Sequence, residues 1–218
     1  LKLKTGDRHR VGQIDGKLGT AAVVAMAPNV VLEIISLDDL PPKKSPVELI
    51  LALPRPKSLR RIFRATANIG IKSIHVIHSY RVEKSYWSAP ALTPEILRSS
   101  LLEGLSIAKD TVLPVVHLHK LFKPFAQDIA PGLPSHRAFV AHPGDSRNDT
   151  IGASHLVTQI RGPVPVAIGP EGGFTEYEVN LFNEAGFESL SLGSRVLSVE
   201  TAIPTIETYL REKISPLA

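Results

Sequence analysis

The sequence predicts an α/β protein with two unequal domains, and three observations lead to this conclusion. Its 218 residues are enough for one large domain or two smaller ones, but hardly for more. The first 36 residues contain strand-like runs and almost no helical pattern, whereas strands alternate with helices after residue 46. Hydrophobic residues make up 43% and charged residues 21%, which is typical of a globular chain and excludes wholesale disorder.

The first part of the chain predicts a small antiparallel barrel or sheet. Its strand-like runs cover residues 8–14, 20–26 and 30–35. The pairs Asp15-Gly16 and Pro28-Asn29 separate them as turns. A polar, proline-rich segment at 38–46 then stiffens the chain and removes backbone donors. We therefore expect domains at residues 1–40 and 46–218, the first of them incomplete because residue 1 is not Met.

The second part predicts a largely parallel sheet with helices on its faces. We expect strands at residues 47–53, 73–79, 137–142, 164–168 and 188–192. We expect helices at residues 57–69, 93–109, 175–185 and 199–211. Thr175 and Glu178 form a capping box at the start of the third helix. Pro204 is compatible with the last helix only in its first turn, where its missing N–H would be unpaired anyway.

Charge and composition narrow the function. Up to Phe125 the chain has 19 basic and 10 acidic residues, and from Ala126 onward it has 6 and 11. This asymmetry indicates that one surface meets a polyanion, although basic residues that merely keep the first part soluble are the alternative. With no Cys, disulfides, thiolate metal sites and cysteine nucleophiles are excluded. No apolar run approaches the roughly 20 residues that cross a bilayer, so we expect a soluble, cytoplasmic protein.

The helix at 57–69 carries a basic face. Its cations Lys57, Arg60, Arg61 and Arg64 are spaced i, i+3, i+4 and i+7, and Arg55 precedes them. No acid occurs between residues 55 and 64, so a polyanion such as an RNA backbone would relieve the repulsion among these cations. The alternative is the solvated face of an ordinary amphipathic helix.

A glycine-rich segment follows the strand at 164–168. It reads Ile168-Gly169-Pro170-Glu171-Gly172-Gly173-Phe174, and its glycines allow close backbone approach to a ligand. It has no lysine and matches neither common phosphate-binding pattern, and Glu171 would repel a phosphate. A ligand with adenosine but no phosphate, or with a positive centre, fits better. A glycine-rich turn without function is the alternative.

Two further strand-end segments lie in the same part of the chain. One reads Leu192-Gly193-Ser194-Arg195-Val196-Leu197, and Glu200, Thr201 and Ala202 open the helix beyond it. Helix capping alone would explain Glu200 and Thr201, but Arg195 has no such local role. The other reads Ala141-His142-Pro143. Together with the glycine-rich segment, these loops are expected to converge on one pocket.

Histidine pairs are the weaker signals. His75 and His78 fall on opposite faces of a strand, whereas His117 and His119 share a face. No third ligand has a recognisable spacing, so we expect no metal site. The sequence also lacks G-x-S-x-G, which argues against a serine hydrolase.

The paired segments 169–174 and 192–202 resemble those of the RsmE family, the 16S rRNA (uracil-N3) methyltransferases of the SPOUT superfamily. Ala141-His142-Pro143, Leu53-Pro54 and Arg81-Val82-Glu83-Lys84 are similar too, and the resemblance covers nearly the whole chain. It implies a PUA-like N-terminal barrel that binds RNA and a C-terminal SPOUT-type domain tied in a deep trefoil knot. It also implies a homodimer, S-adenosyl-L-methionine in the knot loops, and the small ribosomal subunit as partner.

The resemblance assigns roles to residues. Methyl transfer to uracil N3 requires loss of a proton and leaves negative charge on the ring. Our hypothesis is that Arg195 supplies the positive charge and that Glu171 or Glu200 orients or accepts the proton. The residues expected to bind the cofactor are Ala141, His142, Pro143, Ile168, Gly169, Pro170, Gly172, Gly173, Leu192, Gly193, Val196, Leu197, Thr201 and Ala202. The residues expected to bind RNA are Arg55, Lys57, Arg60, Arg61, Arg64, Arg81 and Lys84.

The chain also departs from the family's pattern. Ser198 stands where the family usually has a second arginine, Tyr80 where an acid is common, and basic residues are absent near Asp110 and Val112. Because the missing arginine lies beside the expected site, a non-catalytic RNA-binding protein is the main alternative. An adenine-nucleotide enzyme with another reaction is a third interpretation.

Overall fold

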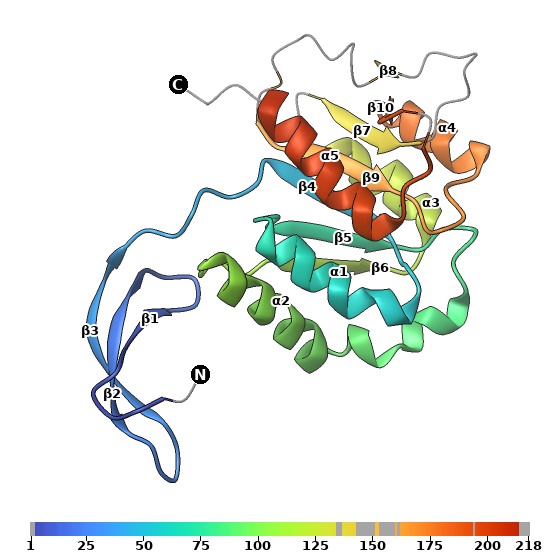
Figure 1. Cartoon of the computed structure of the whole chain (residues 1–218). Coiled ribbons are helices and arrows are strands. Elements are labelled where there is room, and N and C mark those ends of the chain that lie inside the picture. The colour runs from blue at the N-terminus through green and yellow to red at the C-terminus, as the bar shows by residue number, and fades with distance from the viewer. Residues whose placement is uncertain are drawn as a thin grey trace.

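A computed structural model describes residues 3–133, 137–142, 151–152, 160, 162–193 and 195–213. The chain begins with a three-stranded antiparallel sheet that lies apart from the rest of the molecule (Figure 1). Its strands, in spatial order, are β1 (Arg8–Gly12), β2 (Leu18–Ala25) and β3 (Val31–Asp39). One face of β2 is buried, but β3 is exposed over most of its length. The predicted antiparallel arrangement of this part is therefore confirmed as a sheet.

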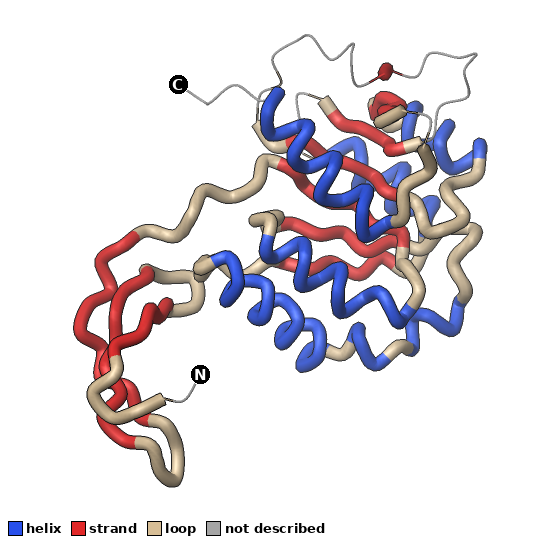
Figure 2. The backbone as a smooth tube through the Cα atoms, in the orientation of Figure 1, coloured by secondary structure: helices blue, strands red, loops and turns tan. Residues whose placement is uncertain are grey.

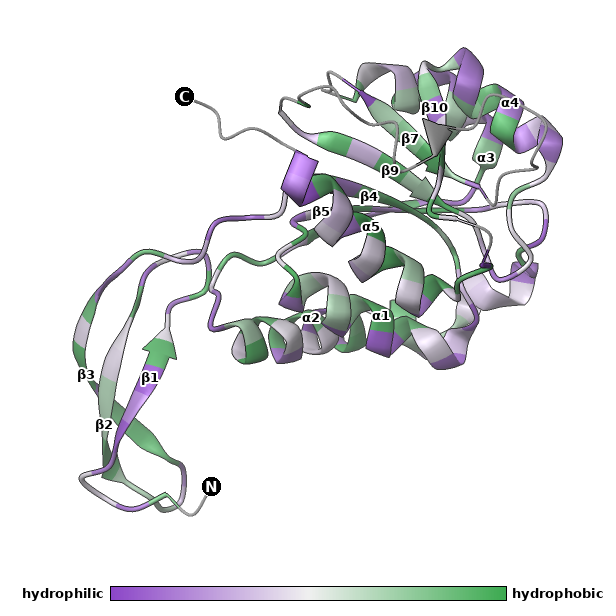
Figure 3. Ribbon diagram, turned by 45° about the horizontal axis from the view of Figure 1, so that its top comes forward, coloured by the Kyte–Doolittle hydropathy of each residue, from purple (hydrophilic) through white to green (hydrophobic). Residues whose placement is uncertain are grey.

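A seven-stranded sheet forms the second part, in the order β6-β5-β4-β9-β7-β10-β8, and all its neighbours pair in parallel. Its strands are β4 (Val47–Ala52), β5 (Ser73–Ile77), β6 (Val115–His119), β7 (Ala138–Ala141), β8 (Ile151–Gly152), β9 (Val164–Ile168) and β10 (Phe187–Ser191). The central strand β9 is buried along its whole length, as its uninterrupted apolar sequence requires in a sheet covered on both faces. Figure 3 shows the hydrophobic colour concentrated on these central strands.

Helices cover both faces of this sheet (Figures 1 and 2). The long helices α1 (Pro56–Asn68), α2 (Pro94–Ala108) and α5 (Val199–Lys213) lie on one face. The short α3 (Phe122–Pro124), the π-helix η3 (Phe125–Ile129) and α4 (Glu176–Glu184) lie on the other. The remaining short helices are η1 (Lys84–Ser88), η2 (Pro90–Leu92) and η4 (Ala130–Gly132). No helix in these described stretches is long and apolar enough to cross a membrane.

The turn between β1 and β2 contacts the segment that follows α2. The backbone N–H of Asp15 donates to the carbonyl oxygen of Thr111 at 2.8 Å, and the Thr111 hydroxyl donates to the carbonyl of Gly16 at 2.5 Å. The Asp15 carboxylate also accepts the Leu113 N–H at 2.9 Å. These contacts attach the small sheet to the segment after α2, in addition to the proline-rich connection at residues 40–46.

The last helix corrects one prediction. Helix α5 begins at Val199, so Pro204 is its sixth residue and lies beyond the first turn. The expectation that Pro204 belongs to the first turn is therefore wrong. Because proline has no backbone N–H, the Glu200 carbonyl lacks the helical hydrogen bond that residue 204 would otherwise donate. In the next position the Thr205 hydroxyl donates to the Thr201 carbonyl at 2.7 Å, which adds a bond to this part of the helix. Helix α4, in contrast, begins at the predicted capping box of Thr175 and Glu178.

Candidate functional site

A hollow of about 280 Å³ opens at the carboxyl ends of β7, β9 and β10. In open parallel sheets, ligands bind at such strand ends. We call it the site hollow. Its walls comprise Ala141, His142, Ile168, Gly169, Pro170, Glu171, Gly172, Gly173, Leu190, Ser191, Leu192, Gly193, Arg195, Val196, Leu197, Val199, Ala202 and Ile206. The three predicted loops thus meet at one place. Of the predicted residues in these loops, Pro143 lies outside the described part of the chain.

The glycine-rich loop supplies one wall largely from backbone. A Cβ atom on Gly169 would lie 2.9 Å from the Phe174 nitrogen, so only glycine fits there without a shift. Gly173 has φ +72°, and its N–H donates to the Pro170 carbonyl at 2.7 Å. The loop therefore turns back on itself and presents main-chain groups to the hollow.

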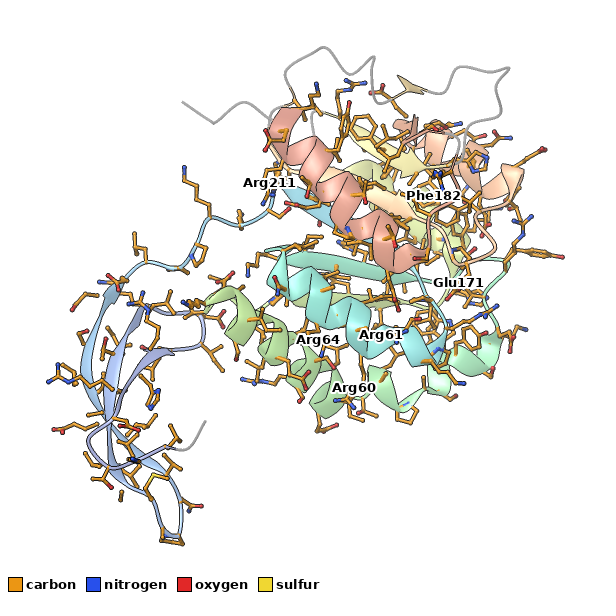
Figure 4. All side chains as sticks on the ribbon, in the orientation of Figure 1. Arg60, Arg61, Arg64, Glu171, Phe182 and Arg211 are labelled. Atoms are coloured by element: carbon orange, nitrogen blue, oxygen red, sulfur yellow. The ribbon has the colours of Figure 1, made fainter. Side chains whose placement is uncertain are left out.

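Two residues from other loops hold this wall in place. The Glu171 side chain accepts the backbone N–H of Arg55 at 3.1 Å, which ties the loop to the start of α1. Figure 4 shows Glu171 at this edge of the sheet, near the beginning of α1. The Arg81 guanidinium donates to the carbonyl of Gly172, and a Cβ on Gly172 would lie 3.0 Å from the Arg81 Cδ. Arg81 thus contacts the wall of the hollow, and its expected contact with RNA stays a prediction.

The opposite wall is the segment between β10 and α5. Gly193 has φ +114°, and its N–H donates to the Ser191 hydroxyl at 3.3 Å. Arg195 and Val196 are exposed at the rim, Val196 by 78%. Four wall residues were missed by sequence reasoning: Leu190, Ser191, Val199 and Ile206. The spacing of Val199, Ala202 and Ile206 on one helix face was the available signal for two of them.

His142 contributes a polar atom that the described residues leave unsatisfied. Its backbone N–H donates to the Leu190 carbonyl at 3.1 Å, which fixes its position between β7 and β10. Its ring Nδ1 is buried and has no hydrogen-bond partner within the described part of the chain. Buried polar groups are rarely left unpaired, so this nitrogen is suited to bond with a ligand in the hollow.

Glu200 and Thr201 do not line the site hollow. The Glu200 carboxylate accepts the Arg61 guanidinium at 2.9 Å and borders a second hollow, of about 320 Å³, between α1 and α5. We call it the helix hollow. The Thr201 hydroxyl lies 3.0 Å from that of Ser198, at the start of α5. Of the three predicted catalytic residues, the fold therefore brings together Arg195 and Glu171.

The predicted RNA-binding cations fall into two groups. Arg60 and Arg64 each lie 3.7 Å from the carboxylate of Glu103 on α2, and Arg61 pairs with Glu200, so acids from other helices offset their repulsion (Figure 4). The sequence had indicated no nearby acid because these partners are distant along the chain. Within the described residues, no ion pair involves the exposed cations Arg55, Lys57 and Lys84.

The histidines gather at the other side of the sheet, on β5 and β6. His75 Nδ1 lies 3.0 Å from His119 Nε2, and His75 Nε2 lies 3.0 Å from the Glu48 carboxylate. The hydrogen bond from His75 lowers the pKa of Glu48, and burial lowers the pKa of His119. The described residues contain no group of three side chains arranged to hold a metal ion. This cluster therefore ties strands together through hydrogen bonds.

Comparisons with known proteins agree with this geometry. The sequence pattern of the RNA methyltransferase domain matches residues 41–211, which is the second part of the chain. The ribosomal RNA small subunit methyltransferase E of Treponema pallidum is 31% identical over 93% of this chain and 76% of its own length. A protein of that same description from Synechocystis is 26% identical over 94% of this chain and 66% of its own length.

Solved structures share the fold. The ribosomal RNA small subunit methyltransferase E of Neisseria gonorrhoeae, solved with S-adenosylmethionine bound, superposes with a TM-score of 0.77. The aligned region covers 100% of this chain and 87% of the Neisseria chain, at 17% identity. The chain is thus an RNA methyltransferase by class. It belongs to the ribosomal RNA small subunit methyltransferase E family, the RsmE family that its loops resemble.

Proposed function

We propose that the protein transfers a methyl group from S-adenosyl-L-methionine to N3 of a uridine in 16S rRNA of the small ribosomal subunit. The observation that carries this proposal is the site hollow, in a chain of the RsmE family. Its glycine-rich wall presents backbone and a carboxylate and contains no lysine. A donor with adenosine and a sulfonium, but no phosphate, suits such a wall.

The residues present fit this donor. A Cβ on Gly169 would meet the loop's own backbone, so glycine lets the loop fold tightly, and the orphaned Nδ1 of His142 is available for a hydrogen bond. Hydrophobic walls from Leu192, Leu197 and other apolar residues suit an adenine ring. When bound, the donor supplies an electrophilic methyl group. What the chain supplies is position, because in-line displacement depends chiefly on alignment.

Arg195 and Glu171 would act on the uracil. Removal of the N3 proton leaves negative charge on the ring, and the exposed guanidinium of Arg195 at the rim is placed to stabilise it. A carboxylate is needed to orient or accept the proton. Glu171 lines the hollow whereas Glu200 is engaged with Arg61, so we favour Glu171 for this role.

The finer architecture is also a proposal. We infer that the three-stranded sheet belongs to a PUA-like RNA-binding domain and that the second part is a SPOUT domain with a deep trefoil knot. The family resemblance supports both. The resemblance also supports a homodimer, which sedimentation over a range of concentrations would reveal, and a cytoplasmic location.

The experiment is transfer of a labelled methyl group to unmodified small subunits, followed by mapping of the modified base. We expect label at a uridine N3, and Arg195→Ala is expected to reduce the rate strongly. Calorimetry should show tighter binding of S-adenosylhomocysteine than of ATP or NAD. Label on another base would refute the N3 assignment. Binding of RNA without any methyl transfer would favour the non-catalytic alternative, which the serine at position 198 motivates.

A further inference from the structure

Two aromatic side chains are more exposed to solvent than the other aromatic side chains of this chain. The chain has one Trp, four Tyr and seven Phe, all of them within the described residues. Among them, Tyr80 and Tyr177 are the predominantly exposed ones, by 83% and 59%. In the described structure, neither ring stacks on another ring or makes a side-chain hydrogen bond. Each therefore offers a free π-face to solvent.

One buried carboxylate anchors both tyrosines. Glu178 is 2% exposed, and its Oε1 accepts the backbone N–H of Tyr80 at 2.8 Å. Its Oε2 accepts the backbone N–H of Thr175 at 2.8 Å, within the capping box of α4. Tyr177 is the residue directly before Glu178 in that helix. The backbones of the two tyrosines are thus held next to each other at a rigid point of the fold.

This point borders the glycine-rich wall of the site hollow. Tyr80 directly precedes Arg81, whose guanidinium donates to the Gly172 carbonyl. Tyr177 lies three residues after Phe174, where the same loop ends. Both tyrosines therefore lie on segments that adjoin this loop.

Cations lie on the segments that meet here. Arg55 donates its backbone N–H to Glu171 of the loop, and Lys84 follows Tyr80 in the segment that leads into η1. Both side chains are exposed and make no ion pair among the described residues, and the same holds for Lys57. Exposed aromatics near cations without an ion-pair partner suit the binding of single-stranded nucleic acid, and the exposed Glu83 and Glu176 give this surface mixed charge.

We propose that Tyr80 and Tyr177 form a stacking platform for unpaired bases that flank the target nucleotide. Arg55, Lys57 and Lys84 would contact the phosphates of the same strand. This inference rests on the proposed function, because it names where the RNA strand lies relative to the hollow. It keeps Arg55, Lys57 and Lys84 from the RNA-binding residues expected from the sequence, and it leaves out the ion-paired arginines of α1.

The test measures binding of a labelled single-stranded RNA of about ten nucleotides by fluorescence anisotropy, with the full chain and without methyl donor. Tyr80→Ala and Tyr177→Ala are each expected to weaken binding by about 5- to 100-fold, because a stacked base is lost. Tyr80→Phe and Tyr177→Phe keep the ring and should stay within about twofold. Lys84→Ala should reduce the salt dependence of binding, whereas the alanine variants of the tyrosines should not. Ile107→Ala is the matched control, since this apolar residue on α2 is exposed to about the same extent as Tyr177.

Three outcomes would overturn the platform. One is wild-type affinity in both alanine variants, and another is a loss in the phenylalanine variants as large as in the alanine variants. The third is a change of oligomeric state in sedimentation, with RNA affinity unchanged, which would assign this surface to a second copy of the chain. Calorimetry with S-adenosylhomocysteine separates this proposal from the one above. A chain that binds RNA through these tyrosines but not this compound would keep the platform and lose the methyltransferase assignment.

Discussion

The site hollow and the helix hollow are similar in size, and each places a glutamate near an arginine residue. In the site hollow, Glu171 accepts a backbone N–H of Arg55, and the wall is built from glycine-containing loops at strand ends. In the helix hollow, Glu200 accepts the guanidinium of Arg61, and the wall is built from side chains on α1, α2 and α5. What separates a candidate ligand site from a packing groove is therefore wall chemistry and not volume.

The two glutamates provide the sharpest test of this comparison. We expect Glu171→Gln to lower the rate of methyl transfer by about 10²- to 10⁴-fold, the usual contribution of a general base. Glu200→Gln should lower it far less, and should cost at most about 1 kcal/mol of stability, because its ion pair with Arg61 is exposed. Labelled methyl transfer to small subunits and thermal denaturation measure the two effects. A larger rate loss for Glu200→Gln would reverse the assignment.

Adding a side chain to the glycine-rich wall should produce the next largest loss in the rate of methyl transfer. Gly169→Ala places a Cβ 2.9 Å from the Phe174 nitrogen, so the loop must shift. A displacement of about 1 Å can cost roughly 100-fold in rate. Gly132→Ala is the matched control, since a Cβ there meets nothing within 4 Å. If Gly169→Ala binds S-adenosylhomocysteine and turns over as the control does, the loop does not hold the donor.

Removing the Arg81 side chain, which contacts the glycine-rich wall, should moderately lower the affinity for S-adenosylhomocysteine. Arg81→Ala deletes the guanidinium that donates to the Gly172 carbonyl. Because the pair is exposed, we expect about a tenfold loss in affinity for S-adenosylhomocysteine, towards the lower end for a charged hydrogen bond. Arg98→Ala, an exposed arginine on α2, serves as control. Calorimetry measures both variants. Should Arg81→Ala weaken RNA binding alone, the residue contacts substrate, as the sequence had suggested.

The smallest expected effect lies far from both hollows, in the dependence of stability on pH. Burial lowers the pKa of His119 from its ordinary value of 6.5, so stability that depends on the neutral ring is lost as pH falls below about that value. The pKa of Glu48 is also lowered, by its hydrogen bond with His75, so stability falls again as that carboxylate is protonated at lower pH. Urea denaturation between pH 8 and pH 4 should show both phases. His119→Gln should remove the first, and an unchanged profile in that variant would contradict its origin.

The sequence predicted the wall of the site hollow better than its surroundings. Gly173 and Gly193 were recognisable because strand-end glycines, here with positive φ, leave a local pattern, and Gly169 belongs to the same glycine-rich segment as Gly173. The contact of Arg81 with Gly172 joins residues 91 positions apart, and that of Arg61 with Glu200 joins residues 139 apart. No local pattern contains such pairs, because tertiary packing alone brings them together.

The same limit applies to the fold. The alternation of strands and helices predicted the parallel sheet, and Thr175 with Glu178 predicted the start of α4. Strand β6 was not predicted, because its sequence Val-Val-His-Leu-His lies at an exposed sheet edge where the apolar pattern is weak. Pro204 was placed wrongly because its cost to α5 was judged locally, without the packing of that helix on α1 and the sheet.

The turn between β1 and β2 provides a second attachment for the amino-terminal sheet. The amino-terminal sheet is joined to the catalytic part at two places, the covalent connection before Val47 and the hydrogen bonds between Asp15-Gly16 and Thr111. Two attachments restrict the orientation of this sheet more than a single connection would. If the sheet binds RNA as proposed, the bound strand would be held in a restricted orientation toward the second part of the chain.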